Sequence, residues 1–244
     1  MKSVVPIALM LLVSFRMPVC AQGVCENARA IFEAVEAHHV QPLAMDDSLS
    51  ARVFDQWLLL LDNDKVLFTT EDVASISHLR LQLDNKLQTN TCDFTAIVAQ
   101  LYLKKLVKTR QRVDSLLGKP MNFDSEAFID ILPPSGFASA KANRQRLSNL
   151  LRSHVLQACY RKALSLDTPF TATLLTSLEA EARLRVKRKY TRPLESAIEN
   201  AVLRDSLVVN AFYKAIARAF DPHTTYFSPA EMEAFTSTIS EQWL

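Results

Sequence analysis

Glycine is scarce in this chain, which has Gly23, Gly118 and Gly136 as its three glycines among 244 residues. An average protein of this length would contain about 17, at the usual ~7%. Because glycine supplies the positive-φ positions of tight turns and bulges, a many-stranded sandwich or barrel is disfavoured. The P-loop and the G-x-G-x-x-G dinucleotide turn are excluded, since no two glycines lie close enough for either motif. With 49% hydrophobic residues available for a core, we expect an all-α protein.

The first 21 residues have the pattern of a secretory signal peptide. Lys2 provides the basic start that such signals have. The apolar run from Val4 to Phe15 is too short to span a bilayer as a helix. Val19 and Ala21 place small residues before a cleavage site that follows Ala21. The alternative is a lipoprotein signal that ends at Cys20 and attaches the chain to a membrane.

Removal of this segment changes the charge balance, because it contains two basic residues and no acidic one. The mature chain then has 26 basic and 26 acidic residues and a net charge of zero, which gives no general attraction to nucleic acid. Basic residues cluster at 104–112 and 183–192 and could bind phosphate groups. We favour solvated helix faces instead, since Glu179 and Glu181 can pair with the second cluster at helical spacing.

No catalytic, cofactor-binding or metal-ligating residue is predicted from the side-chain pattern. His38 and His39 end a helix and have no two further metal ligands nearby in sequence. His154 and Cys159, five residues apart on a predicted helix, would point about 140° apart around its axis. Neither G-x-S-x-G nor S-x-x-K occurs.

Three cysteines remain after the predicted cleavage: Cys25, Cys92 and Cys159. None has a C-x-x-C partner, so neither a metal knuckle nor a redox motif is supported. Export implies an oxidising compartment in which a disulfide can form. One bridge with one free thiol and no bridge at all are both compatible with this count.

Apolar periodicity, capping residues and prolines predict a series of long antiparallel helices. Predicted N-caps are Ser48 or Ser50, Thr70, and Thr168. A Pro-rich break at Pro133–Gly136 divides the chain into two halves near residues 120–139. The expected helices cover residues 26–39, 48–61, 70–87, 93–117, 140–164, 168–190, 194–220 and 231–240.

Two stretches of the chain contain distinctive motifs. Residues 50–73, SARVFDQWLLLLDNDKVLFTTEDV, contain a helix that ends in Leu-Asp, then a basic residue, an aromatic residue and an Asp that opens the next helix. This stretch and the preceding AHHVQPL at 37–43 resemble the tail-specific (carboxy-terminal processing) serine proteases. Residues 219–229, AFDPHTTYFSP, are similar to the signature that precedes the family's peptide-binding PDZ domain. The matching signature residues are Asp62, Phe68, Asp72, Asp221, Pro222, His223, Tyr226 and Pro229.

The resemblance implies a domain organisation. Residues 1–21 would be the signal peptide, residues 22–228 the family's N-terminal helical domain, and residues 229–244 the truncated start of a link to a missing PDZ domain. Family members continue into the PDZ domain and a catalytic core with a serine nucleophile and a lysine base. Those residues have no counterpart here, so no catalytic residue is transferred.

The resemblance therefore implies a periplasmic, non-catalytic domain that supports proteolysis of exported proteins and needs no cofactor. Its expected partners are the missing PDZ and protease domains or a full-length protease, together with protein substrates. Nucleic acid is not an expected partner, and membrane association is expected only through a lipid at Cys20. The alternative is a stand-alone helical adaptor or regulator that binds a protease or its substrates.

The second signature also has a structural interpretation of its own. Asp221 can accept backbone N–H groups in an Asx turn, and Pro222 presets φ for that turn. His223 and Tyr226 could form hydrogen bonds across it. We expect a rigid elbow that orients whatever follows.

Overall fold

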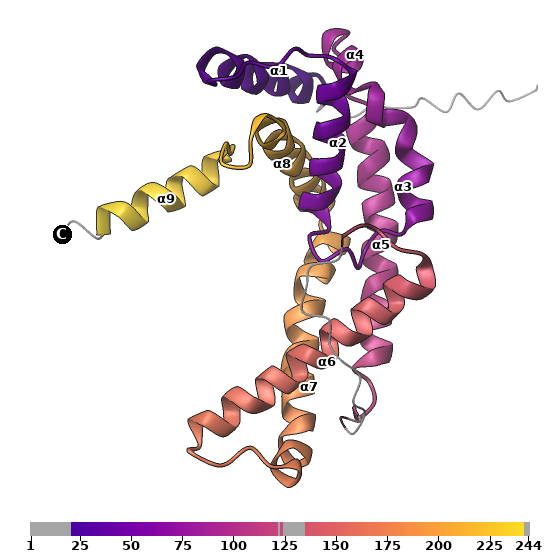
Figure 1. The fold of residues 1–244 in the computed structure, drawn as a ribbon, viewed down its shortest axis with the longest axis vertical. Helices are drawn as coiled ribbons and strands as arrows, with labels where there is room; N and C mark the ends of the chain where they lie inside the picture. The colour runs from indigo at the N-terminus through magenta and orange to yellow at the C-terminus, as the bar shows by residue number, and fades with distance from the viewer. Residues whose placement is uncertain (1–20, 122, 124–134, 242–244) are drawn as a thin grey trace, which may run out of the picture.

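The structure, a computed structural model, describes residues 21–121, 123 and 135–241 and is all-α, as predicted (Figure 1). Within these residues the β-structure is limited to one isolated bridge between Thr69 and Ala138. The predicted signal peptide, apart from Ala21, and Pro133 and Pro134 of the predicted break lie outside the described residues. The helices are α1 (Ala21–His38), α2 (Asp47–Leu61), α3 (Thr70–Ile76), the 3-10 helix η1 (Ser77–Leu81), α4 (Leu83–Gln88), α5 (Phe94–Leu116), α6 (Ala140–Ser165), α7 (Ala172–Glu199), α8 (Ala201–Phe220) and α9 (Pro229–Glu241).

One hydrophobic core lies in the part of the molecule that we call the head, formed by α1–α4, η1, the first half of α5, and α8 (Figure 1). Trp57 of α2 is fully buried there, and its Nε1–H donates to the Val208 carbonyl at 2.9 Å. The rings of Phe94 and Phe212 lie 5.9 Å and 5.0 Å from the Trp57 ring. These aromatic contacts join α2, α5 and α8, helices that are far apart in the sequence.

A second core lies in the part that we call the arm, formed by the end of α5 with α6 and α7 (Figure 1). Its fully buried side chains include Val113 of α5 and Leu147, Leu151 and Val155 of α6. Because α6 and α7 form a long hairpin, this part agrees with the predicted antiparallel helices. Leu194 packs against both cores and connects the arm to the head.

Three predicted N-caps are wrong by a few residues. Asp46 caps α2 by accepting the Leu49 N–H at 2.9 Å, whereas Ser50 is buried and donates its hydroxyl hydrogen to Asp84. Thr69, rather than Thr70, caps α3. Thr171, rather than Thr168, caps α7. Each chain segment offers several adjacent capping residues, and local spacing does not distinguish among them.

Two predicted helix boundaries are also wrong. The segment expected to be one helix over 70–87 consists of α3, η1 and α4. In contrast, α7 continues through Pro193 to Glu199, where a break between two helices was expected near 190–194. An internal proline costs about 3 kcal/mol in a helix. Burial of Ala197 and the packing of Leu194 against both cores offset that cost.

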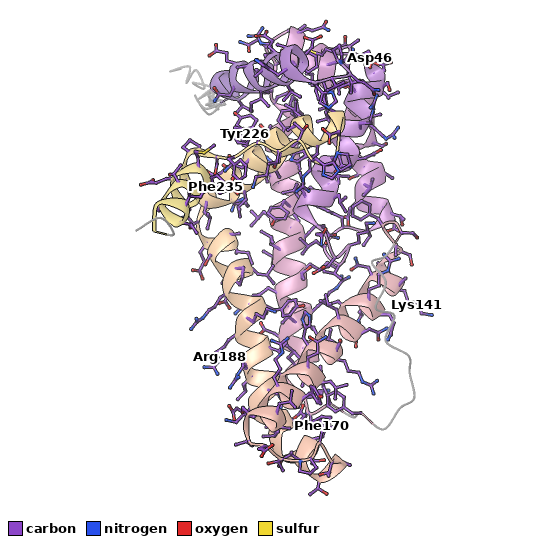
Figure 2. The ribbon with its side chains drawn as sticks, turned by 60° about the vertical axis from the view of Figure 1, so that its left-hand side comes forward. Asp46, Lys141, Phe170, Arg188, Tyr226 and Phe235 are labelled. Carbon is purple, nitrogen blue, oxygen red and sulfur yellow. A yellow bond between two sulfur atoms is a disulfide. The ribbon has the colours of Figure 1, made fainter. Side chains whose placement is uncertain are left out.

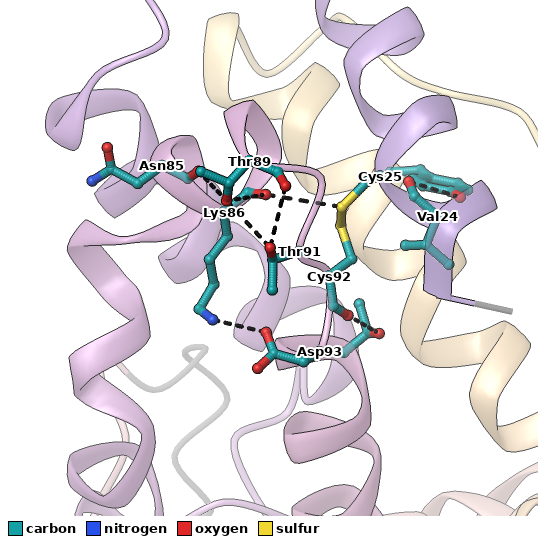
Figure 3. The surroundings of a disulfide bond; sticks show 10 residues. Val24, Cys25, Asn85, Lys86, Thr89, Thr91, Cys92 and Asp93 are labelled. Atoms are coloured by element: carbon teal, nitrogen blue, oxygen red, sulfur yellow. Dashed lines mark hydrogen bonds and ion pairs between the residues drawn. A yellow bond between two sulfur atoms is a disulfide. The ribbon is translucent and has the colours of Figure 1, made fainter. Parts of the chain in front are cut away.

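A disulfide joins Cys25 of α1 to Cys92, in the connection before α5 (Figure 3). Cys159 is a buried free thiol in the arm. This is the first of the two arrangements that the cysteine count allowed. Beside the bridge, the Lys86 ammonium contacts the Asp93 carboxylate at 2.7 Å and stabilises the same connection (Figure 3).

Candidate functional site

The first signature folds the connection between α2 and α3. Asp62 follows the last residue of α2 and is buried, and its carboxylate accepts the N–H groups of Val66, Leu67 and Phe68 at 2.8–2.9 Å. Burial raises the pKa of Asp62, and the three backbone donors oppose that rise. The carboxylate thus serves as the hydrogen-bond acceptor for three consecutive backbone N–H groups of this connection. The connection held in this way carries the Phe68 ring, which is buried in the core.

Asp72 completes this connection from the start of α3. It accepts the Thr69 N–H and hydroxyl, each at 2.8 Å, and forms an ion pair with Lys105 of α5. Burial acts to raise the pKa of Asp72, but the hydrogen bonds from Lys105 and Thr69 outweigh it, so this pKa lies below its ordinary value. Lys105 is itself buried, with 7% of its side chain exposed, which contradicts its assignment to a solvated face.

Asn143 connects the same region to the arm. It is fully buried at the start of α6, and its amide donates to the carbonyls of Lys65 and Phe68 at 3.2 Å and 3.1 Å. Its oxygen accepts from Arg112 at 3.0 Å. The first signature therefore lies where head and arm join, and its hydrogen bonds connect the two parts.

The second signature forms the elbow between α8 and α9, residues 221–228. Asp221 ends α8, and its carboxylate accepts the His223 N–H at 2.7 Å and the Thr224 hydroxyl, which forms the predicted Asx turn. These two donors, followed by His39, lower the pKa of Asp221 to about 2. Pro222 and His223 are exposed, so the turn uses the backbone of His223 rather than its ring.

His39 attaches the elbow to the end of α1, a contact that the sequence did not reveal. Its Nε2 lies 3.0 Å from the Asp221 carboxylate and its Nδ1 lies 2.8 Å from the Gln41 carbonyl. The Gln41 carbonyl, and then Asp221, raise the pKa of His39, because a protonated ring donates to both oxygens. The ring also lies 5.6 Å from that of Phe220. These contacts fix the His39 ring between the end of α1 and the elbow.

The end of the elbow is linked to α8 and to the start of α9. The ring of Tyr226 packs edge-on against that of Tyr213, with centroids 5.4 Å apart. Ser228 and Glu231 form a reciprocal capping box around Pro229, the first residue of α9. Glu231 also forms an ion pair with Lys214 of α8; this contact and the Ser228 N–H lower the pKa of Glu231 to about 2.

Helix α9 leaves the head at this elbow and points away from it (Figure 1). One face of α9 is apolar and open to solvent, through Met232, Phe235 and Ile239 at helical spacing. Phe227 of the elbow stacks on Phe235 (Figure 2 labels Phe235), and these four side chains are between 41% and 50% exposed. We call these four residues the α9 face.

Comparison with known proteins agrees with both signatures. The model of the tail specific protease N-terminal domain family matches residues 31–230. This chain belongs to that family. It is also similar to the tail-specific protease of Haemophilus influenzae, with 23% identity over 209 residues that cover 83% of this chain and 27% of that protein. The chain thus spans about a quarter of the length of this relative.

The range matched by the family model includes the whole elbow and ends one residue after Pro229. The matched range also includes both basic clusters, and ion pairs occupy much of them. Arg183 and Arg185 pair with Glu179 and Glu181 as predicted, and Lys187 pairs with Asp114. These pairs support the interpretation of the second cluster as a structural face.

Among the described residues of this domain, no group of three or more His, Cys, Asp or Glu side chains could hold a metal ion. His154 lies 2.7 Å from the Tyr190 hydroxyl, and Cys159 is buried in the arm core. In the part of the chain that the structure covers, no helix is long and apolar enough to cross a bilayer. Sequence reasoning missed His39–Asp221, Lys105–Asp72 and Asn143, because each contact joins segments far apart in the chain.

Proposed function

We propose that this chain acts as the non-catalytic helical domain of an exported tail-specific serine protease and supports proteolysis of periplasmic proteins. Its role is to pack on the PDZ and protease domains and to frame the entrance for protein substrates. The observation that carries this proposal is the elbow, which holds α9 away from the head with the α9 face exposed. A face of this kind suits contact with a further domain.

The contacts at the elbow favour a defined direction for α9 over a flexible tether. Asp221 is held by three donors, and Glu231 connects the first turn of α9 to α8. A fixed helix loses less conformational freedom when it docks than a disordered segment does. The disulfide supports export, since such bonds persist in oxidising compartments. A signal peptide cleaved after Ala21, or a lipoprotein signal ending at Cys20, would provide that export.

The test combines the purified chain with the PDZ and protease portion of a tail-specific protease from which the helical domain has been removed. We expect binding, and faster cleavage of an unstructured peptide than the protease portion achieves alone. The chain by itself should not cleave this peptide. Phe235→Asp should weaken binding at least tenfold, because it places a charge in the apolar contact. Val202→Asp on α8 is the matched control, since Val202 is exposed and lies outside the α9 face.

Three results would contradict the proposal. Cleavage by the chain alone would show that catalysis resides in these residues. Equal binding by the Phe235→Asp and Val202→Asp variants would show that the α9 face does not make the contact. Binding to an intact full-length protease, but not to the fragment that lacks the helical domain, would favour a stand-alone adaptor instead.

A further inference from the structure

The far end of the arm has a group of exposed apolar side chains that neither core uses. We call it the tip, and it consists of Tyr160, Leu164, Leu166 and Phe170, which are between 38% and 61% exposed. They come from the last turns of α6 and the connection to α7. The rings of Tyr160 and Phe170 pack edge-on with centroids 5.5 Å apart, so the cluster has a defined shape. Phe170 lies at the opposite end of the molecule from Asp46 (Figure 2).

The tip belongs to a basic segment of a chain that is neutral once the predicted signal peptide is removed. Residues 140–192 contain twelve Lys and Arg residues and three Asp and Glu residues, a formal net charge of +9. The remainder of the chain from residue 22 onward therefore has a net charge of −9. Arg161 and Lys162 lie within the tip sequence itself, between Tyr160 and Leu164.

Two of the three acidic residues of residues 140–192 are paired on α7, and the third lies in the tip, so residues 160–170 have a formal net charge of +1 from Arg161, Lys162 and Asp167. Glu179 and Glu181 pair with Arg183 and Arg185 on α7. The remaining one, Asp167, follows α6 with a positive φ of 49°, a conformation that Asp tolerates better than most residues.

We propose that the tip binds the surface of an anionic phospholipid bilayer. Aromatic and aliphatic side chains enter the headgroup region of a bilayer, while Lys and Arg beside them contact lipid phosphates. The shape favours this partner over a protein, because the tip is the protruding end of a hairpin whose first helix is about 39 Å long. A flat bilayer can reach such an end directly, whereas a protein would have to supply a matching pocket. This association needs no lipid at Cys20, and it is independent of the α9 face.

The test measures binding of the chain that begins at Gln22 to lipid vesicles. The apolar run of residues 4–15 must be absent, because it would enter lipid by itself. Both cores start at Val24 or later, so this shorter chain keeps every buried contact described above. Vesicles of phosphatidylcholine with about 30% phosphatidylglycerol are compared with pure phosphatidylcholine by flotation, in about 0.1 M salt, where charges act over ~10 Å.

We expect clear binding to the anionic vesicles and at least tenfold weaker binding to the neutral ones. Leu166→Ser with Phe170→Ser should weaken binding to anionic vesicles at least tenfold, since each buried methylene group contributes a factor of about four. Arg161→Gln with Lys162→Gln should weaken it about 25-fold, at a factor of about five per charge near an anionic surface.

Matched controls remove the same residue types away from the tip. Val202→Ser with Leu207→Ser removes two exposed apolar side chains of α8, and Arg218→Gln removes an exposed charge of the head. These variants should bind like the unmodified chain, and circular dichroism melts should show that all variants fold. The proposal is overturned if the unmodified chain does not bind anionic vesicles, or if tip and control variants bind equally. In the first case the tip would be assigned to a protein partner.

Discussion

Reduction of the Cys25–Cys92 bridge should lower the free energy of unfolding by about 4 kcal/mol. The two cysteines are 67 residues apart in the sequence. In the chain-entropy treatment, a bridge over that separation lowers the entropy of the unfolded chain by about 15 cal/mol/K, which is about 4 kcal/mol at 25 °C. This is a large share of the 5–15 kcal/mol that typically separates folded from unfolded domains.

The folded state should change little when the bridge is reduced. Val24, Ala28 and Phe32 of α1 remain buried against the head, so α1 keeps its packing without the covalent bond. The expected loss therefore comes from greater freedom of the unfolded chain. Cys159 is already a free thiol, so the reductant has no second bridge to break among the described residues.

The assay is urea unfolding followed by circular dichroism at 222 nm, with and without a phosphine reductant. The native spectrum should be unchanged, while the midpoint falls. A Cys25→Ala/Cys92→Ala variant is the control and should show no response to the reductant. A change below about 1 kcal/mol in the unmodified chain would refute the entropic reasoning, because the unfolded chain would then retain the contact without the bond.

Two further predictions concern buried and paired charges. Lys105→Ala should lower the free energy of unfolding in urea by about 3 kcal/mol, since it leaves the partly buried Asp72 carboxylate without its cation. Lys104→Ala on the exposed face is the control and should change this free energy by no more than about 0.5 kcal/mol. Equal losses in the two variants would show that the buried ion pair does not contribute more than an exposed lysine. The His39–Asp221 contact should stabilise the folded chain most between about pH 4 and 6.5. The contribution of Asp221 is lost as pH falls towards its pKa of about 2. The contribution of His39 is lost as pH rises through its raised pKa. The difference in unfolding free energy between the unmodified chain and Asp221→Asn, measured across pH, should show this maximum, and a flat difference would contradict it.

The helices could be predicted from the sequence because their signals are local. Apolar spacing of three and four residues and the order Gly118 then Pro120 at the end of α5 depend on neighbouring residues alone. The Asx turn at Asp221 was predictable for the same reason, since its donor is two residues away. The scarcity of glycine disfavours many-stranded sandwiches and barrels before any contact is known.

The errors occurred where long-range packing outweighs a local signal. Pro193 predicts a helix end, yet packing of Leu194 against both cores keeps α7 continuous. Lys105 has the sequence pattern of a solvent-exposed lysine, yet Asp72 lies opposite it on α3. Sequence spacing could not identify Asp72 as the partner of Lys105, because the two residues are 33 positions apart. It could not identify the packing of Leu194 either, because that packing depends on how the two cores meet.

The sequence alone determined that this chain is helical, where most of its helices lie, and that two signatures resemble tail-specific proteases. The tertiary structure decided which cysteines pair, that His39 holds the elbow, and that α9 and the tip expose apolar side chains. The physical reason is the range of the interactions. Helix formation follows from residues three or four positions apart, whereas a disulfide, a buried ion pair or an open face depends on which distant segments the fold brings together.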